Sequence, residues 1–241
     1  MVEEPLLVVA GLRAGYGDVQ VLWGIDFAVA QGEIACLIGS NGAGKTTLLR
    51  ALSGLLRPSL GSVRFAGKEL AGAAPEQVLS AGIAHVPEGR RLFAAMSVRD
   101  NLLMGAYLRR ERPAALAREL ERVYQLFPIL AERRGQDAGT LSGGEQQMCA
   151  VARGLMSAPR LLLIDELSLG LAPAVVDQLC DALRRLNREG LTLLVVEQDV
   201  ATALELARDC HVMDTGRITR SGTSEELRND PAIKEAYLGV I

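Results

Sequence analysis

A glycine-rich segment constrains the fold of this chain more than any other feature. Gly39-Ser40-Asn41-Gly42-Ala43-Gly44-Lys45-Thr46 lies between an apolar run, Ile34–Ile38, and a stretch expected to be helical, Thr46–Leu52. A strand, a G-x-x-x-x-G-K-[ST] turn and a helix in this order form a phosphate-binding loop. Its glycines allow several backbone N–H groups to point at phosphate oxygens, and the positive end of the helix faces the same anion. The segment therefore predicts a nucleoside triphosphate site in a P-loop NTPase core.

The side chains of this loop have separate expected roles. Lys45 supplies a mobile cation for the outer phosphates, and the Thr46 hydroxyl is placed to ligate Mg²⁺. The loop alone does not distinguish a kinase, a GTPase or a transporter motor. The residues expected to hold the nucleotide here are Gly39, Ser40, Asn41, Gly42, Ala43, Gly44, Lys45, Thr46 and Thr47.

Two acids follow a second apolar run. Leu161–Ile164 reads as a buried strand, and Asp165 and Glu166 come directly after it. Acids at the carboxyl end of such a strand face the crevice where α/β proteins bind ligands. Asp165 is placed to reach Mg²⁺, and Glu166 to orient and polarise an attacking water. The same pattern occurs at ordinary strand-to-loop junctions, but its occurrence together with the phosphate loop favours a functional role for the two acids.

The apolar pattern along the chain predicts an α/β fold. Continuous apolar runs suit strands that are buried on both faces, as in a parallel sheet flanked by helices. Pro173 can open a helix whose apolar face continues to Leu186. The expected strands are Ile34–Ile38, Ile83–Val86, Leu161–Ile164 and Leu193–Val196, and the expected helical face is Val175, Val176, Leu179, Leu183 and Leu186.

Two regions depart from this pattern. Leu6–Val9 and Val19–Val29, punctuated by glycines, predict an antiparallel β section at the N-terminus. Residues 97–157 contain no convincing strand and carry a helical stripe up to Pro128. We expect a single domain, 1–241, in which a helical subdomain, about 97–157, is inserted into a core of residues 1–96 and 158–241.

Composition and charge exclude several classes of protein. A net charge of -3 argues against a nucleic-acid-binding protein, which is expected to be basic. Met1-Val2-Glu3-Glu4 is acidic where a secretory signal would be basic, and the apolar runs are too short to cross a bilayer. We expect a soluble chain that meets a membrane only through partners. Its cysteines (Cys36, Cys149, Cys180 and Cys210) are scattered, which indicates reduced, mostly buried thiols.

Leu141-Ser142-Gly143-Gly144-Glu145-Gln146-Gln147 is the most specific stretch. Ser142 and Glu145 form a capping box, so a helix should begin here and continue to about Ser157. The capping box does not explain Gly143 and Gly144, because glycine in a first helical turn costs stability. Two glycines at a helix start instead expose backbone amides to an anion.

This stretch resembles the signature motif of ATP-binding-cassette (ABC) ATPases, and the resemblance covers essentially the whole chain. It implies ATP hydrolysis between two subunits that pack head to tail, with ATP and Mg²⁺ bound. Ser142, Gly143 and Gly144 would contact the γ-phosphate of ATP on the partner. Tyr16 would stack on adenine, and the loop Ser168–Pro173 would cross to the partner.

Three positions depart from the general family pattern. Glu88 replaces a glutamine that usually contacts Mg²⁺, and it adds negative charge that the metal, Arg90 or Arg91 would have to offset. Gln198 replaces a histidine that usually contacts the γ-phosphate; it can donate a hydrogen bond but cannot titrate. The resemblance still places Glu88 and Gln198 with Glu166 among the catalytic residues, and Thr46, Asp165 and Glu88 at the metal. Leu167 replaces a proline, with no evident mechanistic reason.

The same departures resemble one branch of the family. Val86–Phe93, Ser168–Pro173, Glu197-Gln198 and Ala236–Gly239 are similar to one of the two unlike ATPase subunits of branched-chain (hydrophobic) amino-acid importers. Urea and short-chain amide importers share much of this pattern.

The branch implies a set of partners and a location. The chain would form a heterodimer with a second ATPase, or a homodimer in isolation. It would bind two membrane-spanning permease subunits at the cytoplasmic face of the inner membrane, with a periplasmic binding protein acting indirectly. Rival interpretations are a soluble ABC ATPase serving DNA repair or the ribosome, a small-molecule or nucleotide kinase, and a non-hydrolysing nucleotide-binding regulator.

Overall fold

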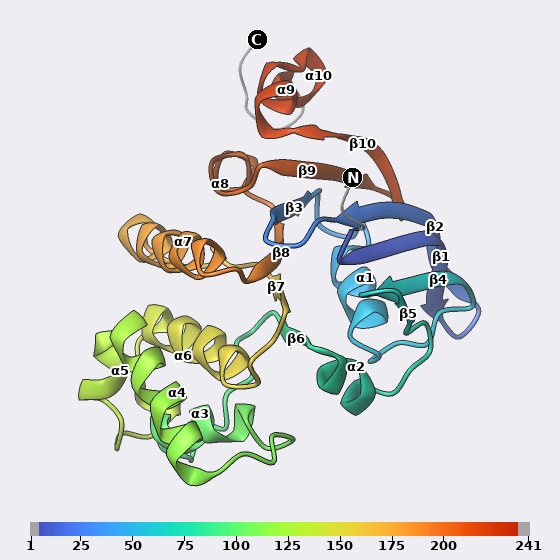
Figure 1. Ribbon diagram of the computed structural model, residues 1–241. Coiled ribbons are helices and arrows are strands. Elements are labelled where there is room, and N and C mark those ends of the chain that lie inside the picture. Colours follow the sequence, from blue (N-terminus) through green and yellow to red (C-terminus); the bar gives the residue numbers. More distant parts are fainter. Residues whose placement is uncertain (1–4, 236–241) are drawn as a thin grey trace.

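The computed structural model describes residues 5–235, which form two β-sheets with helices packed around them (Figure 1). The central sheet has the strand order β10-β9-β3-β8-β7-β6, and its strands are parallel except β10, which pairs antiparallel with β9. Its strands are β3 (Ile34–Ile38), β6 (Ile83–Val86), β7 (Leu161–Asp165), β8 (Thr192–Glu197), β9 (Asp209–Asp214) and β10 (Arg217–Thr223). The expected strands of the parallel core are thereby confirmed.

The second sheet is antiparallel; the N-terminal sequence predicts its first two strands, whereas the two strands from residues 60–69 were not expected. Its order is β2-β1-β4-β5, and a tight hairpin at Gly17 and Asp18 joins β1 to β2. Its strands are β1 (Leu7–Tyr16), β2 (Val19–Val29), β4 (Leu60–Phe65) and β5 (Lys68–Glu69). Figure 1 shows this sheet on one side of the molecule, with α1 (Lys45–Leu52) packed beside it.

The central strands are buried on both faces because each contributes alternate side chains to two different cores. In β3, Ile34, Cys36 and Ile38 belong to a core shared with the helices α6 (Gly143–Leu155), α7 (Pro173–Arg188) and α8 (Val200–Leu206). Ala35 and Leu37 belong to a second core, shared with α1 and the antiparallel sheet. Two apolar faces explain why these strands read as unbroken apolar runs.

The regular secondary structure of residues 97–157 is helical, apart from an isolated β-bridge between Ser97 and Asp137; it includes a 3-10 turn at Ala138–Thr140. This part of the chain is fully described, and Figure 1 shows its helices gathered at one end of the molecule. Its helices are α3 (Val98–Gly105), α4 (Pro113–Leu126), α5 (Pro128–Glu132) and α6. The remaining helices of the described chain are α2 (Pro75–Ala81), α9 (Ser224–Asn229) and α10 (Pro231–Ile233).

Two predicted helices begin where the sequence indicates. The Glu145 N–H bonds the Ser142 hydroxyl and the Ser142 N–H bonds the Glu145 carboxylate, so the capping box starts α6, which ends at Leu155. Pro173 opens α7, whose Leu179, Leu183 and Leu186 are buried while Val175 and Val176 are half-buried.

Other sequence expectations are met within residues 5–235. All four cysteines are buried and free of disulfides. No helix in this range is both long enough and apolar enough to cross a membrane. The Ala236–Gly239 segment lies outside the described residues.

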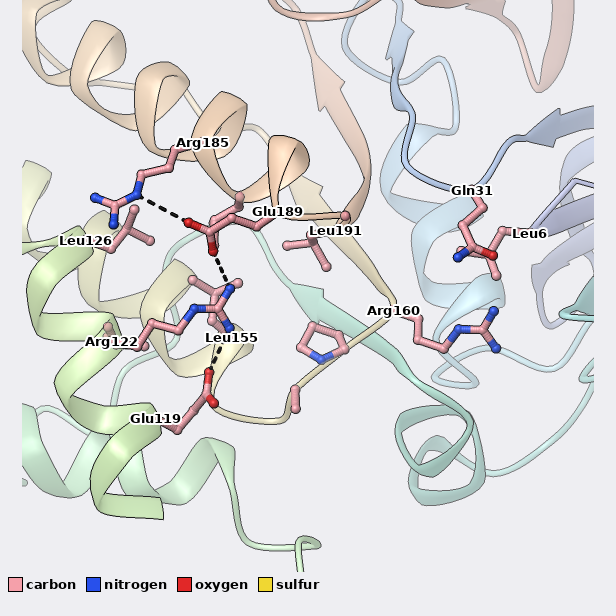
Figure 2. A pocket seen from close by; sticks show the side chains of 15 residues that line it. Leu6, Gln31, Glu119, Arg122, Leu126, Leu155, Arg160, Arg185, Glu189 and Leu191 are labelled. Atoms are coloured by element: carbon pink, nitrogen blue, oxygen red, sulfur yellow. Dashed lines mark hydrogen bonds and ion pairs between the residues drawn. The ribbon is translucent and has the colours of Figure 1, made fainter. Parts of the chain in front are cut away.

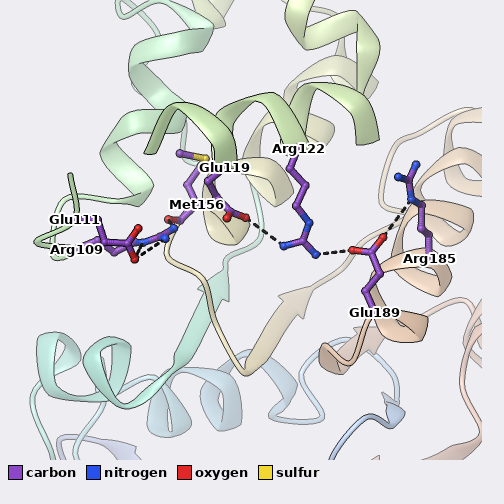
Figure 3. A network of polar contacts seen from close by, with 7 residues as sticks. All are labelled: Arg109, Glu111, Glu119, Arg122, Met156, Arg185 and Glu189. Atoms are coloured by element: carbon purple, nitrogen blue, oxygen red, sulfur yellow. Dashed lines mark hydrogen bonds and ion pairs between the residues drawn. The ribbon is translucent and has the colours of Figure 1, made fainter. Parts of the chain in front are cut away.

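A chain of ion pairs joins the helical region to α7. Arg122 of α4 pairs with Glu119 at 3.3 Å and with Glu189, which directly follows α7; Arg185 binds the other oxygen of Glu189 at 3.4 Å (Figure 3). The two arginine side chains are about half exposed to solvent, so each pair contributes little to stability.

Candidate functional site

The phosphate loop connects β3 to α1 as predicted. Gly42 and Gly44 have φ values of 81° and 104°, which residues with a Cβ rarely adopt. Gly39 approaches β9 so closely that an added Cβ would lie 2.3 Å from the Met213 carbonyl oxygen. The backbone curve of this loop therefore requires glycine at several positions.

Lys45 is buried at the centre of this loop, with 5% of its surface exposed. Its Nζ donates to the carbonyl oxygens of Gly39 at 2.8 Å and Ser40 at 3.0 Å. Burial lowers the pKa of the Lys45 ammonium, while the charges of Glu166 and Asp165 act in the opposite direction. The Lys45 ammonium is therefore bound by neutral carbonyl oxygens, and phosphate oxygens can replace these as its hydrogen-bond acceptors.

A cavity of about 470 Å³ brings most of the predicted site residues together. Residues from the phosphate loop line it together with residues that follow β6, β7 and β8, so the site lies at the carboxyl ends of parallel strands. Its lining is Val21, Asn41, Gly42, Gly44, Lys45, Thr46, Thr47, Glu88, Glu166, Leu169 and Gln198.

Asp165, the last residue of β7, is a buried carboxylate without a hydrogen-bond partner. Only 1% of its surface is exposed, and no group among the described residues hydrogen-bonds either side-chain oxygen. Burial raises its pKa to about 6; the nearby Thr46 hydroxyl and Lys45 oppose this rise, and Glu166 and Glu88 add to it. A buried carboxylate without a hydrogen-bond partner is suited to act as a ligand of a metal cation.

The donor set near Asp165 suits Mg²⁺. Thr46 and Glu88 line the neighbouring cavity, which adds a hydroxyl and a second carboxylate. Within residues 5–235 no cluster of three or more His, Cys, Asp or Glu side chains could hold a metal without further ligands. Mg²⁺ typically uses one or two carboxylates together with substrate phosphates and water, so the two observations agree.

Glu166 has an unusual backbone conformation. Its φ of 53° lies in the left-handed region, its N–H donates to the Val196 carbonyl at 2.9 Å, and its Oε1 accepts a hydrogen bond from the Gln198 amide. A non-glycine residue in this region is strained and persists where its surroundings hold it. The structure therefore joins two predicted catalytic side chains directly.

Glu88 projects into the cavity without help from its neighbouring arginines. Within the described chain, neither Arg90 nor Arg91 forms an ion pair with it. The Arg90 guanidinium lies instead beside Gly143 and 3.4 Å from the Gln146 Oε1. The sequence suggested a metal ion, Arg90 or Arg91 as the group that offsets the negative charge of Glu88. Of these, the metal ion remains.

Ser142, Gly143 and Gly144 lie at the start of α6 and are not among the residues that line the cavity. An added Cβ at Gly144 would lie 2.8 Å from the Val175 Cγ1 of α7, whereas at Gly143 it would meet the movable Arg90 side chain at 3.1 Å. Gly144 thus has a packing role that the sequence did not reveal.

Tyr16 also lies outside the residues that line this cavity. The residue is 44% exposed at the end of β1, and its hydroxyl accepts a hydrogen bond from Arg50 of α1 at 3.1 Å. The side chain is accessible beside the helix of the phosphate loop.

Two further hollows lie away from the phosphate loop. A groove of about 400 Å³ between α2, β6, α3 and α6 exposes Leu55, Phe93, Met104 and Tyr107. A cavity of about 260 Å³ lies between α4, the ends of α6 and α7, and the start of β7 (Figure 2). Figure 2 shows Leu126, Leu155 and Leu191 near its ion pairs.

Comparison with known proteins identifies the family. The family model described as "ABC transporter" matches residues 22–168. The chain belongs to the ABC transporter family. It is 45% identical over 224 residues, 93% of this chain and 95% of the relative, to the high-affinity branched-chain amino acid transport ATP-binding protein BraG of Pseudomonas aeruginosa.

Two further comparisons agree with this family. BraF, a second branched-chain amino acid transport ATP-binding protein of Pseudomonas aeruginosa, is 31% identical over 98% of both chains. The crystal structure of a nucleotide-free ATP-binding cassette from an ABC transporter superimposes with a TM-score of 0.87 at 25% identity, covering 96% of this chain and 98% of that one. The fold is that of an ABC ATPase, and the predictions of the family, the fold and the ATPase activity are confirmed.

One buried residue of this ABC ATPase had no predicted role. Glu197, at the end of β8, is 1% exposed and accepts two hydrogen bonds from Ser168. The sequence marked Glu197 only as part of a branch pattern. An acid that follows four apolar strand residues and directly precedes Gln198 is the sequence signal that could have drawn attention to it.

Proposed function

We propose that this chain is the ATP-hydrolysing motor subunit of an importer for branched-chain or other hydrophobic amino acids. The observation that carries the proposal is its 45% identity to BraG along 93% of its length. The cavity at the phosphate loop supports the motor role, since it is lined by side chains to which we assign parts of ATP hydrolysis: Lys45, Thr46, Glu88, Glu166 and Gln198.

Each side chain of the cavity has a proposed role. Lys45 would move from its carbonyl partners to the outer phosphates of ATP. Glu166 would accept a proton from, or polarise, the attacking water, and Gln198 would hold Glu166 in place and donate to the γ-phosphate. Thr46, Asp165 and Glu88 would hold Mg²⁺, which would neutralise charge on the phosphates.

The second half of the site would come from another subunit. Ser142 is exposed, and the start of α6 presents free amides away from the chain's own cavity. A head-to-tail partner would place ATP against this turn, and Tyr16 would stack on adenine. Two unlike ATP-binding proteins, BraG and BraF, occur in one organism, which favours a heterodimer; a homodimer would form in isolation.

We also propose how the motor meets its membrane partners. The groove between the core and the helical region exposes apolar side chains, and the loop after β6 carries both Glu88 and groove residues such as Phe93. A permease segment seated there would sense the cavity through this loop. Residues 97–157 would act as a subdomain inserted between 1–96 and 158–241. The chain would then lie at the cytoplasmic face of the inner membrane, bound to two permease subunits.

The decisive experiment purifies the chain with its native partners and measures ATPase activity. We expect stimulation by a leucine-loaded binding protein rather than a urea-loaded one. Glu166→Gln should abolish hydrolysis and trap an ATP-bound dimer, whereas Glu132→Gln, at an exposed position of α5, should change neither. Purification without membrane proteins would favour a soluble ABC ATPase, and stimulation by urea alone would favour an amide importer.

A further inference from the structure

The last two residues of β8, Val196 and Glu197, and the next residue, Gln198, hold the turn that follows β7. The Val196 carbonyl accepts the Glu166 N–H at 2.9 Å, and the Gln198 amide donates to the Glu166 carboxylate. Between them, the Glu197 Oε1 accepts the Ser168 N–H at 2.9 Å and its Oε2 accepts the Ser168 hydroxyl at 2.8 Å. The turn is therefore attached to β8 at residues 166 and 168.

Glu197 is not placed to act on the nucleotide. It is 1% exposed and is not among the residues that line the cavity. Burial raises the pKa of its carboxyl, and the two hydrogen bonds from Ser168 act in the opposite direction. A buried carboxylate is costly unless it is hydrogen-bonded, so Ser168 and Glu197 stabilise each other in one geometry.

The residues before and after Ser168 in the chain have proposed functional roles. Glu166 precedes Ser168 by two residues and is in the left-handed conformation, with a φ of 53°. Leu169 follows Ser168, is 52% exposed, and begins the part of the loop that extends to Pro173. The Glu197–Ser168 contact lies between the strained Glu166 and an outward-facing leucine.

We propose that Glu197 is a positioning residue that locks Glu166 and the Ser168–Pro173 loop into one rigid unit. When a second subunit contacts and displaces Leu169, Glu166 would then move with it, because the turn between the two residues cannot flex. This inference rests on the proposed function, because it takes Glu166 as the group that activates water.

The test compares four variants in the complex purified with native partners: Glu197→Ala, Glu197→Gln, Ser168→Ala and the double alanine variant. Glu197→Ala should lower kcat for ATP hydrolysis about 10- to 100-fold with KM for ATP changed less than about threefold, because misplacing a catalytic group affects the chemical step. Glu197→Gln retains both contacts, since its carbonyl accepts the Ser168 N–H and its amide donates to the Ser168 hydroxyl. It should therefore retain kcat within about threefold of wild type.

Two further measurements separate positioning from general damage. The double variant should be no slower than Glu197→Ala alone, because both changes break one unit. Thr192→Val is the matched control: Thr192 is 1% exposed at the other end of β8 and accepts the Gly32 N–H at 2.9 Å. Its loss should lower thermal stability and leave kcat within about twofold.

The outcomes distinguish this inference from the proposed function. If the wild-type complex hydrolyses ATP and Glu197→Ala keeps wild-type kcat, or loses no more than Thr192→Val, the positioning role is wrong while the motor function stands. An equal loss in Glu197→Gln and Glu197→Ala would also overturn it. If Glu166→Gln hydrolyses ATP normally, the proposed function fails independently of Glu197.

Discussion

The unsatisfied carboxylate of Asp165 makes a prediction about stability that does not require a functional assay. Asp165 is buried, and no described group hydrogen-bonds its side-chain oxygens. In the absence of Mg²⁺ and nucleotide its charge should destabilise the folded chain. Replacing it with asparagine removes the charge at nearly constant volume. We therefore expect Asp165→Asn to be more stable than wild type in metal-free buffer at neutral pH, although it should be impaired in hydrolysis.

The magnitude follows from the pKa of Asp165. Burial raises this pKa from an ordinary 3.8 to about 6. At 1.36 kcal/mol for each pKa unit, the ionised side chain costs about 3 kcal/mol of folding free energy. Because the folded pKa is the higher one, stability is fully present below the unfolded pKa and is lost as pH rises through the folded pKa. About 1.5 kcal/mol of the loss should fall between pH 5 and pH 8.

Urea unfolding followed by far-UV circular dichroism, with EDTA and without nucleotide, measures this effect at pH 5, 6, 7 and 8. The free energy gained by Asp165→Asn over wild type should increase with pH and reach about 1–3 kcal/mol at pH 8. Asp177→Asn, which removes an exposed carboxylate from α7, should show no comparable gain. A variant that is less stable than wild type at every pH would refute the reasoning, because it would mean that the folded protein stabilises the Asp165 charge.

Three further predictions concern packing, surface charge and pH dependence. Gly144→Ala should lower the free energy of unfolding by about 1–3 kcal/mol, because its added methyl would lie 2.8 Å from Val175. Gly143→Ala should change this free energy by less than about 1 kcal/mol in the same urea assay, because its methyl would meet only a movable arginine side chain. Arg122→Ala should cost less than about 1 kcal/mol by thermal unfolding, because the Arg122 side chain is half exposed and solvent screens its ion pairs; a larger loss would mean that the ion pairs act as a network. Gln198→His should introduce an inflection in kcat between about pH 6 and 7 that wild type lacks, and an inflection of equal size in wild type would contradict this.

The features that sequence predicted correctly are those encoded by neighbouring residues. The phosphate loop needs only glycines between an apolar run and a helix, and β3 and α1 form on either side of it. The start of α6 needs only Ser142 and its partner Glu145, three residues later. The apolar runs of the central strands reveal burial on both faces because each strand separately carries residues for two cores.

Features that depend on distant parts of the chain were not predictable in this way. Strand β10 was missed because it is polar and mostly exposed at the edge of the sheet, without the apolar pattern of a buried strand. The reason for Gly144 lies in Val175, a residue of another helix. The Tyr16 hydroxyl bonds Arg50, which sequence spacing does not indicate. Each of these contacts arises only after the layers have packed.

The conformation of Glu166 shows why the catalytic geometry belongs to this second class. A glutamate with a φ of 53° is unfavourable in its own local sequence, so nothing in residues 161–168 predicts it. The hydrogen bonds that hold it come from β8 and the residue directly after it. An entire helix separates β8 from β7 in the chain, and the two strands are neighbours only through the parallel crossover. Sequence therefore identifies which acid is available for chemistry, while the strand order decides how that acid is held. A change at Glu197 that leaves the phosphate loop, Asp165, Glu166 and the signature turn intact should for this reason be able to impair hydrolysis.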